Sequence, residues 1–111
     1  MIRALVGFGL KRTDAQIYVF LAKTGPQKAR DITTTLKMYK QQLYRSLKSL
    51  RAKGMVNATF EHPARFYAVS LEKVLDLFVR AKMEEAQSIQ RNKQELLSIW
   101  QSMTTADSIS S

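Results

Sequence analysis

The sequence of 111 residues contains no cysteine and only one histidine, His62. A disulfide framework is therefore excluded, and so is a zinc site of cysteine and histidine ligands, which needs several such residues. We expect no metal ion and no cofactor. The nine acidic residues are scattered, and the sequence shows neither a nucleophile with a histidine partner nor a glycine-rich phosphate loop. These absences predict that the protein is not an enzyme.

Long apolar runs are also scarce. The longest is IYVFLA, residues 17–22, far below the roughly 20 residues that span a bilayer. The N-terminal stretch has no small-residue cleavage signal and is a poor secretory signal. With 45% hydrophobic residues, the chain can bury one modest core. We expect a soluble, cytoplasmic protein that makes no membrane contact.

Acidic residues are few in the first part of the chain. Residues 1–70 hold 13 lysines and arginines against three acids, a net charge of +10, whereas the rest of the chain has a net charge of −1. This asymmetry favours a polyanionic partner, and nucleic acid over a membrane surface, because the basic residues follow the pattern of a folded domain. We therefore expect the protein to associate with the nucleoid.

Three helices are predicted before residue 37. The most regular begins with Thr13 and Gln16, which are spaced as a capping box, buries Ile17, Phe20 and Leu21, and ends at Gly25-Pro26. A short helix over residues 2–8 is expected to cover the core. Another is predicted by apolar residues at helical spacing, namely Ala29, Ile32 and Leu36.

The next predicted helix, residues 40–53, carries the most informative pattern. Leu43, Leu47 and Leu50 fall within about 60° of arc at 100° per residue, and Gly54 supplies the C-terminal cap. The opposite face is amide and cationic, and no acid occurs between residues 32 and 60. A solvated helix gains stability from mixed charges, whereas like charges three or four residues apart repel. We expect an external anion to offset this repulsion.

Residues 55–70 change from helical to alternating periodicity. Two strands joined by a short turn are predicted, with His62 and Arg65 at the tip of the turn. A lone histidine is most often a surface or structural residue. If His62 binds anything, a phosphate or minor-groove contact is favoured over a metal ion.

A long helix is predicted from Leu71 to about Met103, because no proline or glycine interrupts it. Its apolar residues do not form a regular zipper, but they suit a helix that packs on its own domain at one end and on a second copy at the other. The alternative is a frayed monomeric tail, which would expose apolar side chains to water. Residues 104–111 are expected to be disordered. The expected dimer contacts are Leu75, Phe78, Ile89, Leu96, Trp100 and Met103.

The order of these elements predicts a mainly α fold with a small β-hairpin (α+β): a winged helix-turn-helix over residues 1–70, followed by the long helix over 71–103. The sequence LKRTDAQIYVFLAKTGPQKARDITTTLKMYKQQLYRSLKSLRAKGMV with the later ARFYAV resembles the DNA-binding domain of archaeal TrmB-like transcription regulators. The resemblance covers roughly residues 8–80, and it depends on the order and spacing of degenerate motifs.

The resemblance implies a dimeric, sequence-specific repressor or activator, with the helix of residues 40–53 in the major groove and the wing, residues 57–69, on the backbone or in the minor groove. Longer members of the family carry a C-terminal sugar-sensing domain. Because the resemblance does not reach such a domain, no small-molecule effector is expected here.

Candidate DNA contacts follow from the chemistry of the side chains. Glutamine pairs with adenine and arginine with guanine in the major groove, so the expected base-recognition residues are Gln41, Gln42 and Arg45. Phosphates are bound by cations and hydroxyls, and the expected phosphate contacts are Lys28, Arg30, Lys40, Tyr44, Lys48, Ser49, His62 and Arg65.

The turn before the basic helix departs from the family pattern. Lys37 stands where a small residue or glycine is preferred, and a positive φ there would cost on the order of 1 kcal/mol. Tyr39 stands at the position of a serine cap and cannot cap with a short hydroxyl. The first amides of the helix would then be left to water or to a phosphate.

Two other functions remain open. A basic winged helix can bind nucleic acid as an architectural protein without recognising sequence, although the glutamines favour recognition. The fold can also serve as a protein-protein interaction module, which would predict apolar anchors or mixed charge on the outward helix face.

Overall fold

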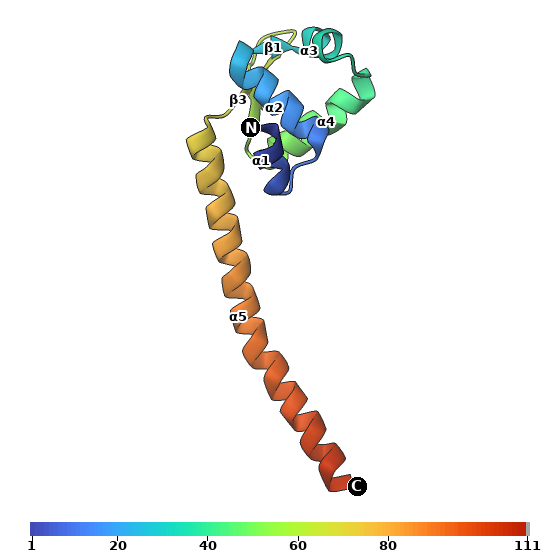
Figure 1. Ribbon diagram of the computed structural model, residues 1–111, viewed down its shortest axis with the longest axis vertical. Coiled ribbons are helices and arrows are strands. Elements are labelled where there is room, and N and C mark those ends of the chain that lie inside the picture. Colours follow the sequence, from blue (N-terminus) through green and yellow to red (C-terminus); the bar gives the residue numbers. More distant parts are fainter. Residues whose placement is uncertain (111) are drawn as a thin grey trace. The chain divides into compact units, whose positions relative to one another are not determined.

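The computed structural model describes the backbone of residues 1–110 and the side chains of residues 1–105 (Figure 1). The chain divides into two compact units, residues 1–77 and residues 78 onward, and each is described by itself. The fold is mainly helical with a small antiparallel sheet and a long C-terminal helix, which confirms the predicted fold class. No helix among the described residues is long and apolar enough to cross a membrane.

The first unit is built from four helices, three short strands and the start of a fifth helix. In chain order they are α1 (Ile2–Gly7), α2 (Arg12–Thr24), β1 (Gln27–Lys28), α3 (Ala29–Leu36), α4 (Lys40–Ala52), β2 (Val56–Ala58), β3 (Arg65–Ala68) and α5 (Leu71–Ser110).

Helix α2 forms the centre of the core. Ile17, Tyr18 and Leu21 are buried, and the Tyr18 hydroxyl donates a hydrogen bond of 2.7 Å to the carbonyl of Val69 at the end of the sheet. The predicted capping box is wrong, because the helix begins at Arg12, its N-cap is Lys11 and no side-chain cap hydrogen bond forms. Phe20 was predicted to be buried but is only partly buried, because it lies at the edge of the apolar stripe.

Helix α4 packs on α2 and α3 through its leucines. Leu43, Leu47 and Leu50 are buried as predicted. The helix ends in a Schellman motif, in which the N–H of Gly54 (φ 74°) donates to the carbonyl of Arg51 and the N–H of Met55 donates to the carbonyl of Leu50. This end directs the chain from α4 into the first strand of the wing.

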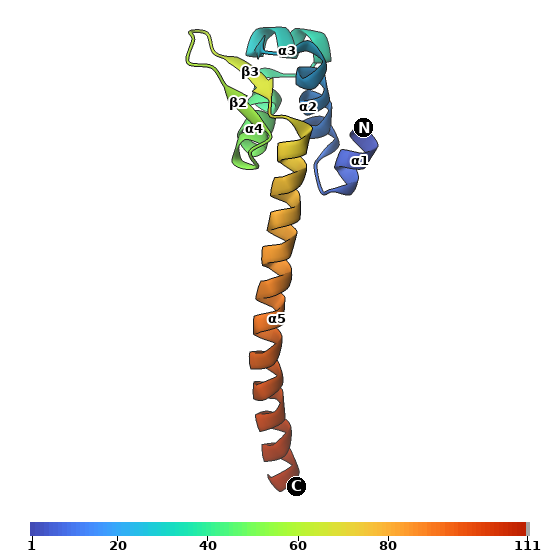
Figure 2. The same cartoon turned by 90° about the vertical axis from the view of Figure 1, so that its left-hand side faces the viewer.

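The sheet has three strands in the order β1-β3-β2, all antiparallel to their neighbours. The sequence predicted only the hairpin of β2 and β3. Strand β1 has two residues, too few for an alternating pattern, and it exists because it pairs with β3. Arg65 is not at the tip of the turn as predicted, because it is the first residue of β3 and lies opposite Lys28. The loop of residues 59–64 forms the tip and projects away from the helices (Figure 2).

Helix α5 begins at Leu71 as predicted and is longer than predicted at its C-terminal end. Val74 is buried and Leu77 still belongs to the first unit, so that unit extends beyond the predicted boundary at residue 70. The helix continues to Ser110, where the sequence predicted an end near Met103 and a disordered tail. No proline or glycine stops it, and the Thr104 hydroxyl donates to the carbonyl of Trp100 within the helix. Ser111 lies outside the described residues.

Replacing Tyr18 with phenylalanine tests the link between α2 and the sheet. The lost hydrogen bond should lower the free energy of unfolding by about 1 kcal/mol. Burial raises the pKa of Tyr18 above its ordinary value of 10.0. The contribution of the hydroxyl is therefore complete below the unfolded pKa and is lost as pH rises through the higher folded pKa. Urea unfolding should show a smaller difference between wild type and Tyr18→Phe at about pH 11 than at pH 7, and an unchanged difference would contradict this role.

Candidate nucleic-acid interface

The outward face of α4 carries amides and cations and no acidic residue of its own. Gln41, Arg45 and Lys48 are exposed on the side opposite the buried leucines. Among the side chains that the structure describes, the ion pairs are Arg65 with Glu61 and Lys82 with Glu85. No described acidic side chain forms an ion pair with the cations of α4.

A groove with a volume of about 1070 Å³ lies between the start of α3, the start of α4 and the wing. Four of the predicted phosphate-binding residues line it together: Lys28, Arg30, Lys40 and Tyr44. Asp31 also lines the groove, as do apolar side chains that include Pro63, Ala64 and Phe66, so its wall carries three cations and one acid on a largely apolar surface. Three consecutive elements, β1, α3 and α4, thus each bring one cation to a concave surface that the wing completes.

Tyr44 connects this groove to the face of α4. Its ring is 47% exposed, and the Nζ atom of Lys40 lies 5.9 Å from the ring centroid, within the range of a cation–π contact. This contact restrains both side chains on the wing side of the helix.

The opposite side of α4 faces the start of α2. Gln42, Arg45 and Ser49 line a small hollow of about 130 Å³ together with Lys11 and the buried Asp14. One carboxylate oxygen of Asp14 has no hydrogen-bond partner among the described residues. Gln42 and Arg45 therefore lie on one side of α4, at the small hollow, and Lys40 and Tyr44 lie on the other side, at the groove. Gln41 and Lys48 lie between these two sides of the helix.

Two cations near these surfaces were not selected from the sequence. Arg51 lines a shallow hollow with Tyr44, Lys48 and Phe66, and Lys11 adjoins Arg45. Arg51 could have been found, because it follows Tyr44 by seven residues and so shares its face. Lys11 could not, because its position depends on the packing of α2 against α4.

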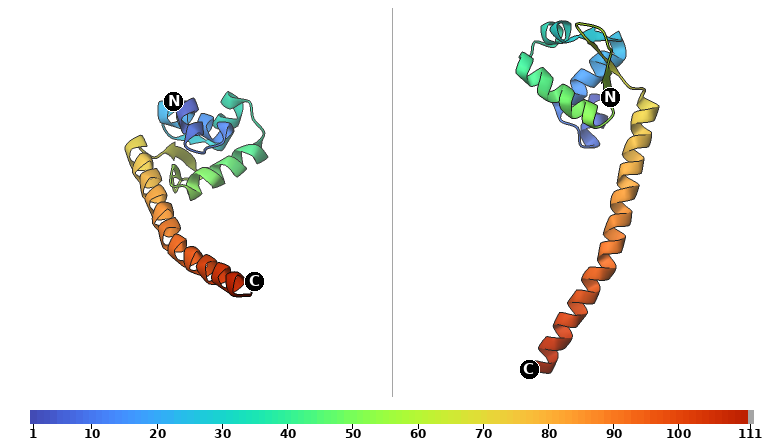
Figure 3. Two further views of the ribbon diagram at one scale, coloured as in Figure 1. Left: turned by 60° about the horizontal axis from the view of Figure 1, so that its bottom comes forward. Right: turned by 180° about the vertical axis from the view of Figure 1, so that it is seen from behind.

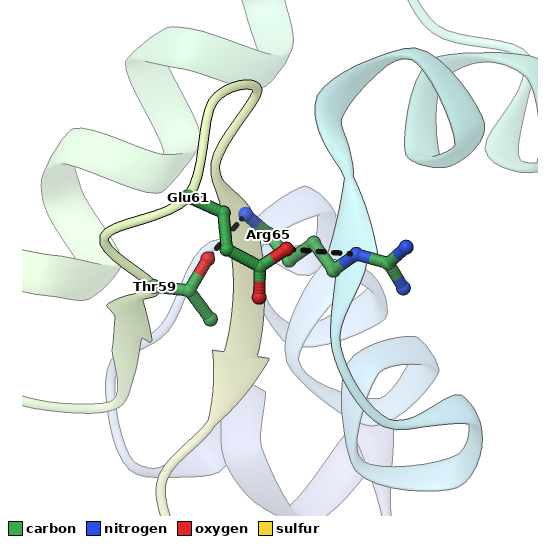
Figure 4. Close-up of polar contacts among 3 residues, drawn as sticks. All are labelled: Thr59, Glu61 and Arg65. Atoms are coloured by element: carbon green, nitrogen blue, oxygen red, sulfur yellow. Dashed lines mark hydrogen bonds and ion pairs between the residues drawn. The ribbon is translucent and has the colours of Figure 1, made fainter.

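The wing is closed by three polar contacts between Thr59, Glu61 and Arg65. Figure 4 marks two of them, the bond to the Thr59 hydroxyl and the ion pair. The backbone N–H of Arg65 donates to the Thr59 hydroxyl at 2.9 Å, and the N–H of Thr59 donates to the carbonyl of Arg65 at 2.8 Å. The Nε of Arg65 lies 3.6 Å from a Glu61 carboxylate oxygen. A phosphate would therefore have to share Arg65 with this acid.

His62 is exposed in the wing loop. Among the described residues, no three histidine, cysteine or acidic side chains are placed to hold a metal ion together.

The turn between α3 and α4 contains the two residues that depart from the family pattern (Figure 3). Lys37 has φ 52° and ψ 55°, which is the left-handed conformation that costs a lysine on the order of 1 kcal/mol. Tyr39 is the N-cap of α4, makes no side-chain cap hydrogen bond and is 84% exposed. The predicted lack of a side-chain cap on α4 is confirmed.

The predicted dimer residues fall into two groups. Leu75 and Phe78 are partly buried. The other four lie in the second unit and are exposed: Ile89, Leu96, Trp100 and Met103.

Comparison with known proteins places this arrangement in a family. Residues 5–72 match the family model described as "Sugar-specific transcriptional regulator TrmB". The chain belongs to the TrmB family. This match covers the winged helix and the start of α5, and it confirms the resemblance found in the sequence. The homologues are transcription regulators, and a DNA-binding winged-helix fold is supported for this chain.

Individual TrmB relatives are similar to the chain over most of its length. One is the HTH-type sugar sensing transcriptional regulator TrmBL1 of Pyrococcus furiosus, 29% identical over 96 residues; these are 86% of this chain but 28% of the relative. A solved structure of TrmBL2, described as an archaeal chromatin protein with a novel mode of DNA binding, gives a TM-score of 0.75 at 24% identity. It covers 89% of this chain and 41% of that one.

The same fold occurs in more distant regulators. A possible transcriptional regulator from Methanosarcina mazei gives a TM-score of 0.64 at 12% identity, covering 79% of this chain and 80% of that one. At such low identity the likeness concerns the fold alone.

Tyr39→Ser tests the uncapped start of α4. Serine should cap the helix and raise the free energy of unfolding by about 1 kcal/mol. If the free amides hold a phosphate, the same substitution should weaken duplex binding, because the hydroxyl then competes for them. Thermal unfolding and a binding titration measure the two effects. A stabilised variant with unchanged DNA affinity would show that Tyr39 has no such role.

Proposed function

We propose that this TrmB-family chain binds double-stranded DNA in a sequence-dependent manner as a homodimer and regulates transcription. Helix α4 would occupy the major groove, and the wing would contact the backbone or the minor groove. A small-molecule effector is not part of the proposal. The winged-helix regulators among its relatives support the DNA-binding part.

One observation carries the proposal: the segregation of α4 into a buried leucine face and an outward face of exposed amides and cations. A major groove admits a helix, and the glutamine and arginine side chains can distinguish base pairs there. Apolar anchors, which a protein-interaction module would present on this face, are missing from its centre at Gln41, Arg45 and Lys48.

We assign base contacts and phosphate contacts by the position of each side chain. Gln41, Gln42 and Arg45 would contact bases, because they lie in the N-terminal half of α4. The groove cations would hold one DNA strand beside the wing. The full set of proposed phosphate contacts is Lys28, Arg30, Lys40, Tyr44, Lys48, Ser49, His62 and Arg65.

The proposed homodimer uses the apolar side chains of α5. Ile89, Leu96 and Trp100 are each more than half exposed, and a second copy would remove them from water. A twofold dimer would present two copies of α4 to one duplex.

A second candidate is architectural binding without base recognition. The cations that could contact phosphates outnumber the residues that could contact bases, and one structural neighbour, TrmBL2, is described as a chromatin protein. That neighbour supports the second candidate but does not identify the function of this chain.

The base and phosphate roles predict different mutant behaviour. Arg45→Ala should cost about 1 to 3 kcal/mol on a preferred duplex and relax sequence choice at one position. Lys48→Ala should weaken all duplexes similarly and reduce the slope of log K against log salt by about one. Titrations of specific and random duplexes at several salt concentrations measure both. Equal losses on both duplexes for Arg45→Ala would remove it from the base-recognition set.

Selection of bound sites from random duplexes tests specificity and symmetry together. The proposal predicts an enriched palindrome whose half-sites lie about 10 base pairs, one helical turn, apart. Enrichment of no motif, with tight binding to every duplex, would instead establish the architectural candidate. A single half-site without symmetry would contradict the homodimer.

A further inference from the structure

The tip of the wing carries an aromatic side chain that no part of the chain covers. Phe60 has a relative exposure of 103%, the largest among the exposed large hydrophobic side chains described. A phenylalanine left entirely in water gains none of the stabilisation that burial of its ring would give. A surface loop of this length gains nothing from such a residue unless something outside the chain covers it.

The wing holds Phe60 outward through its own hydrogen bonds. Thr59 and Arg65 close the loop with two backbone-directed bonds of 2.8 and 2.9 Å, and Glu61 and Arg65 form an ion pair across it. Phe60 lies between the closing residue and the ion-paired acid. The loop is therefore closed by these contacts, and Phe60 is its fully exposed large apolar side chain.

The surroundings of the loop indicate what would cover Phe60. Pro63 and Ala64, in the same loop, line the groove with Lys28, Arg30 and Lys40. A polyanion held by those cations would lie against the wing. Glu61, the acid of the loop, is paired with Arg65, so the tip itself does not strongly repel phosphates. An acidic duplex fits this combination better than an apolar protein partner or a lipid surface.

We infer that Phe60 is an apolar wedge that enters the minor groove of bound DNA and partly unstacks a base step. Minor-groove proteins use Phe, Leu, Ile, Met or Pro in this way and bend the duplex as a result. The inference rests on the proposed function and deepens it, because it gives the wing a role in DNA shape. Flexible pyrimidine–purine steps would be preferred at the site of insertion.

The experiment uses the full chain and the duplex enriched by selection, or a random-sequence duplex if none is enriched. Probes carry 2-aminopurine at successive steps, and its fluorescence rises when a base unstacks. Phe60→Ala should weaken binding about tenfold, a value typical of a lost stacking contact, without changing the slope of log K against log salt, because no charge is removed. The fluorescence increase at one step should disappear.

Two further variants serve as controls. Phe60→Leu retains an apolar wedge and should keep both the fluorescence increase and affinity within about threefold of wild type. Val6→Ala removes another exposed apolar side chain, on α1, and should change neither readout. Because Phe60 is fully exposed, Phe60→Ala should unfold at the wild-type temperature.

The outcomes separate this inference from the proposed function. A stable complex with no unstacked step, or equal affinity of wild type and Phe60→Ala, would overturn the wedge while leaving DNA binding intact. A change of oligomeric state in Phe60→Ala at unchanged DNA affinity would assign Phe60 to a contact between copies and also overturn it. Failure of the wild-type chain to bind any duplex would overturn both.

Discussion

The burial of three leucines of α4 against the rest of the domain determines the orientation of the proposed interface. Leu43, Leu47 and Leu50 are essentially inaccessible, and each contributes about 1.5 to 3 kcal/mol by leaving water. The repulsion between neighbouring cations on the opposite face costs only a few tenths of a kcal/mol per pair. The free energy gained by burying the leucines therefore exceeds the repulsion between the cations. It keeps the cations and glutamines on the outward face whether or not DNA is present.

The second constraint is the pairing of two-residue β1 with β3. This pairing places Lys28 opposite Arg65 and brings the start of α3 beside the wing. The cationic groove depends on it, since three of its basic residues come from β1, α3 and α4. The strand also explains why the wing can be closed so tightly: β3 is hydrogen-bonded on both sides, and only the loop of residues 59–64 extends beyond the sheet.

Periodicity predicted the elements whose identity depends on local pattern. The helix of residues 40–53 and its glycine end follow from spacing and backbone sterics. The positive φ of Lys37 was suggested only by the family resemblance, in which a small residue or glycine is preferred at that position. Features that depend on tertiary contact were not predictable. Strand β1 is too short to have a period, and Lys11 reaches Arg45 only through the packing of α2 on α4. The capping box failed because α2 begins one residue before Thr13.

Among the site residues, the structure brings Lys28, Arg30, Lys40 and Tyr44 to one groove, a grouping that the sequence could not give. The exposure of Phe60 could not be predicted from the sequence either, because a phenylalanine in an alternating segment normally indicates a buried strand position. Strand β2 ends at Ala58, so Phe60 falls in the loop.

Methylation protection of guanine N7 tests the central claim, that α4 enters the major groove, most directly, because N7 lies in that groove. Dimethyl sulfate treatment of the bound duplex should leave guanines protected in two patches about one helical turn apart, within a backbone footprint made by hydroxyl radicals. A backbone footprint without any N7 protection would contradict the claim, since the protein would then bind DNA without placing α4 against the bases.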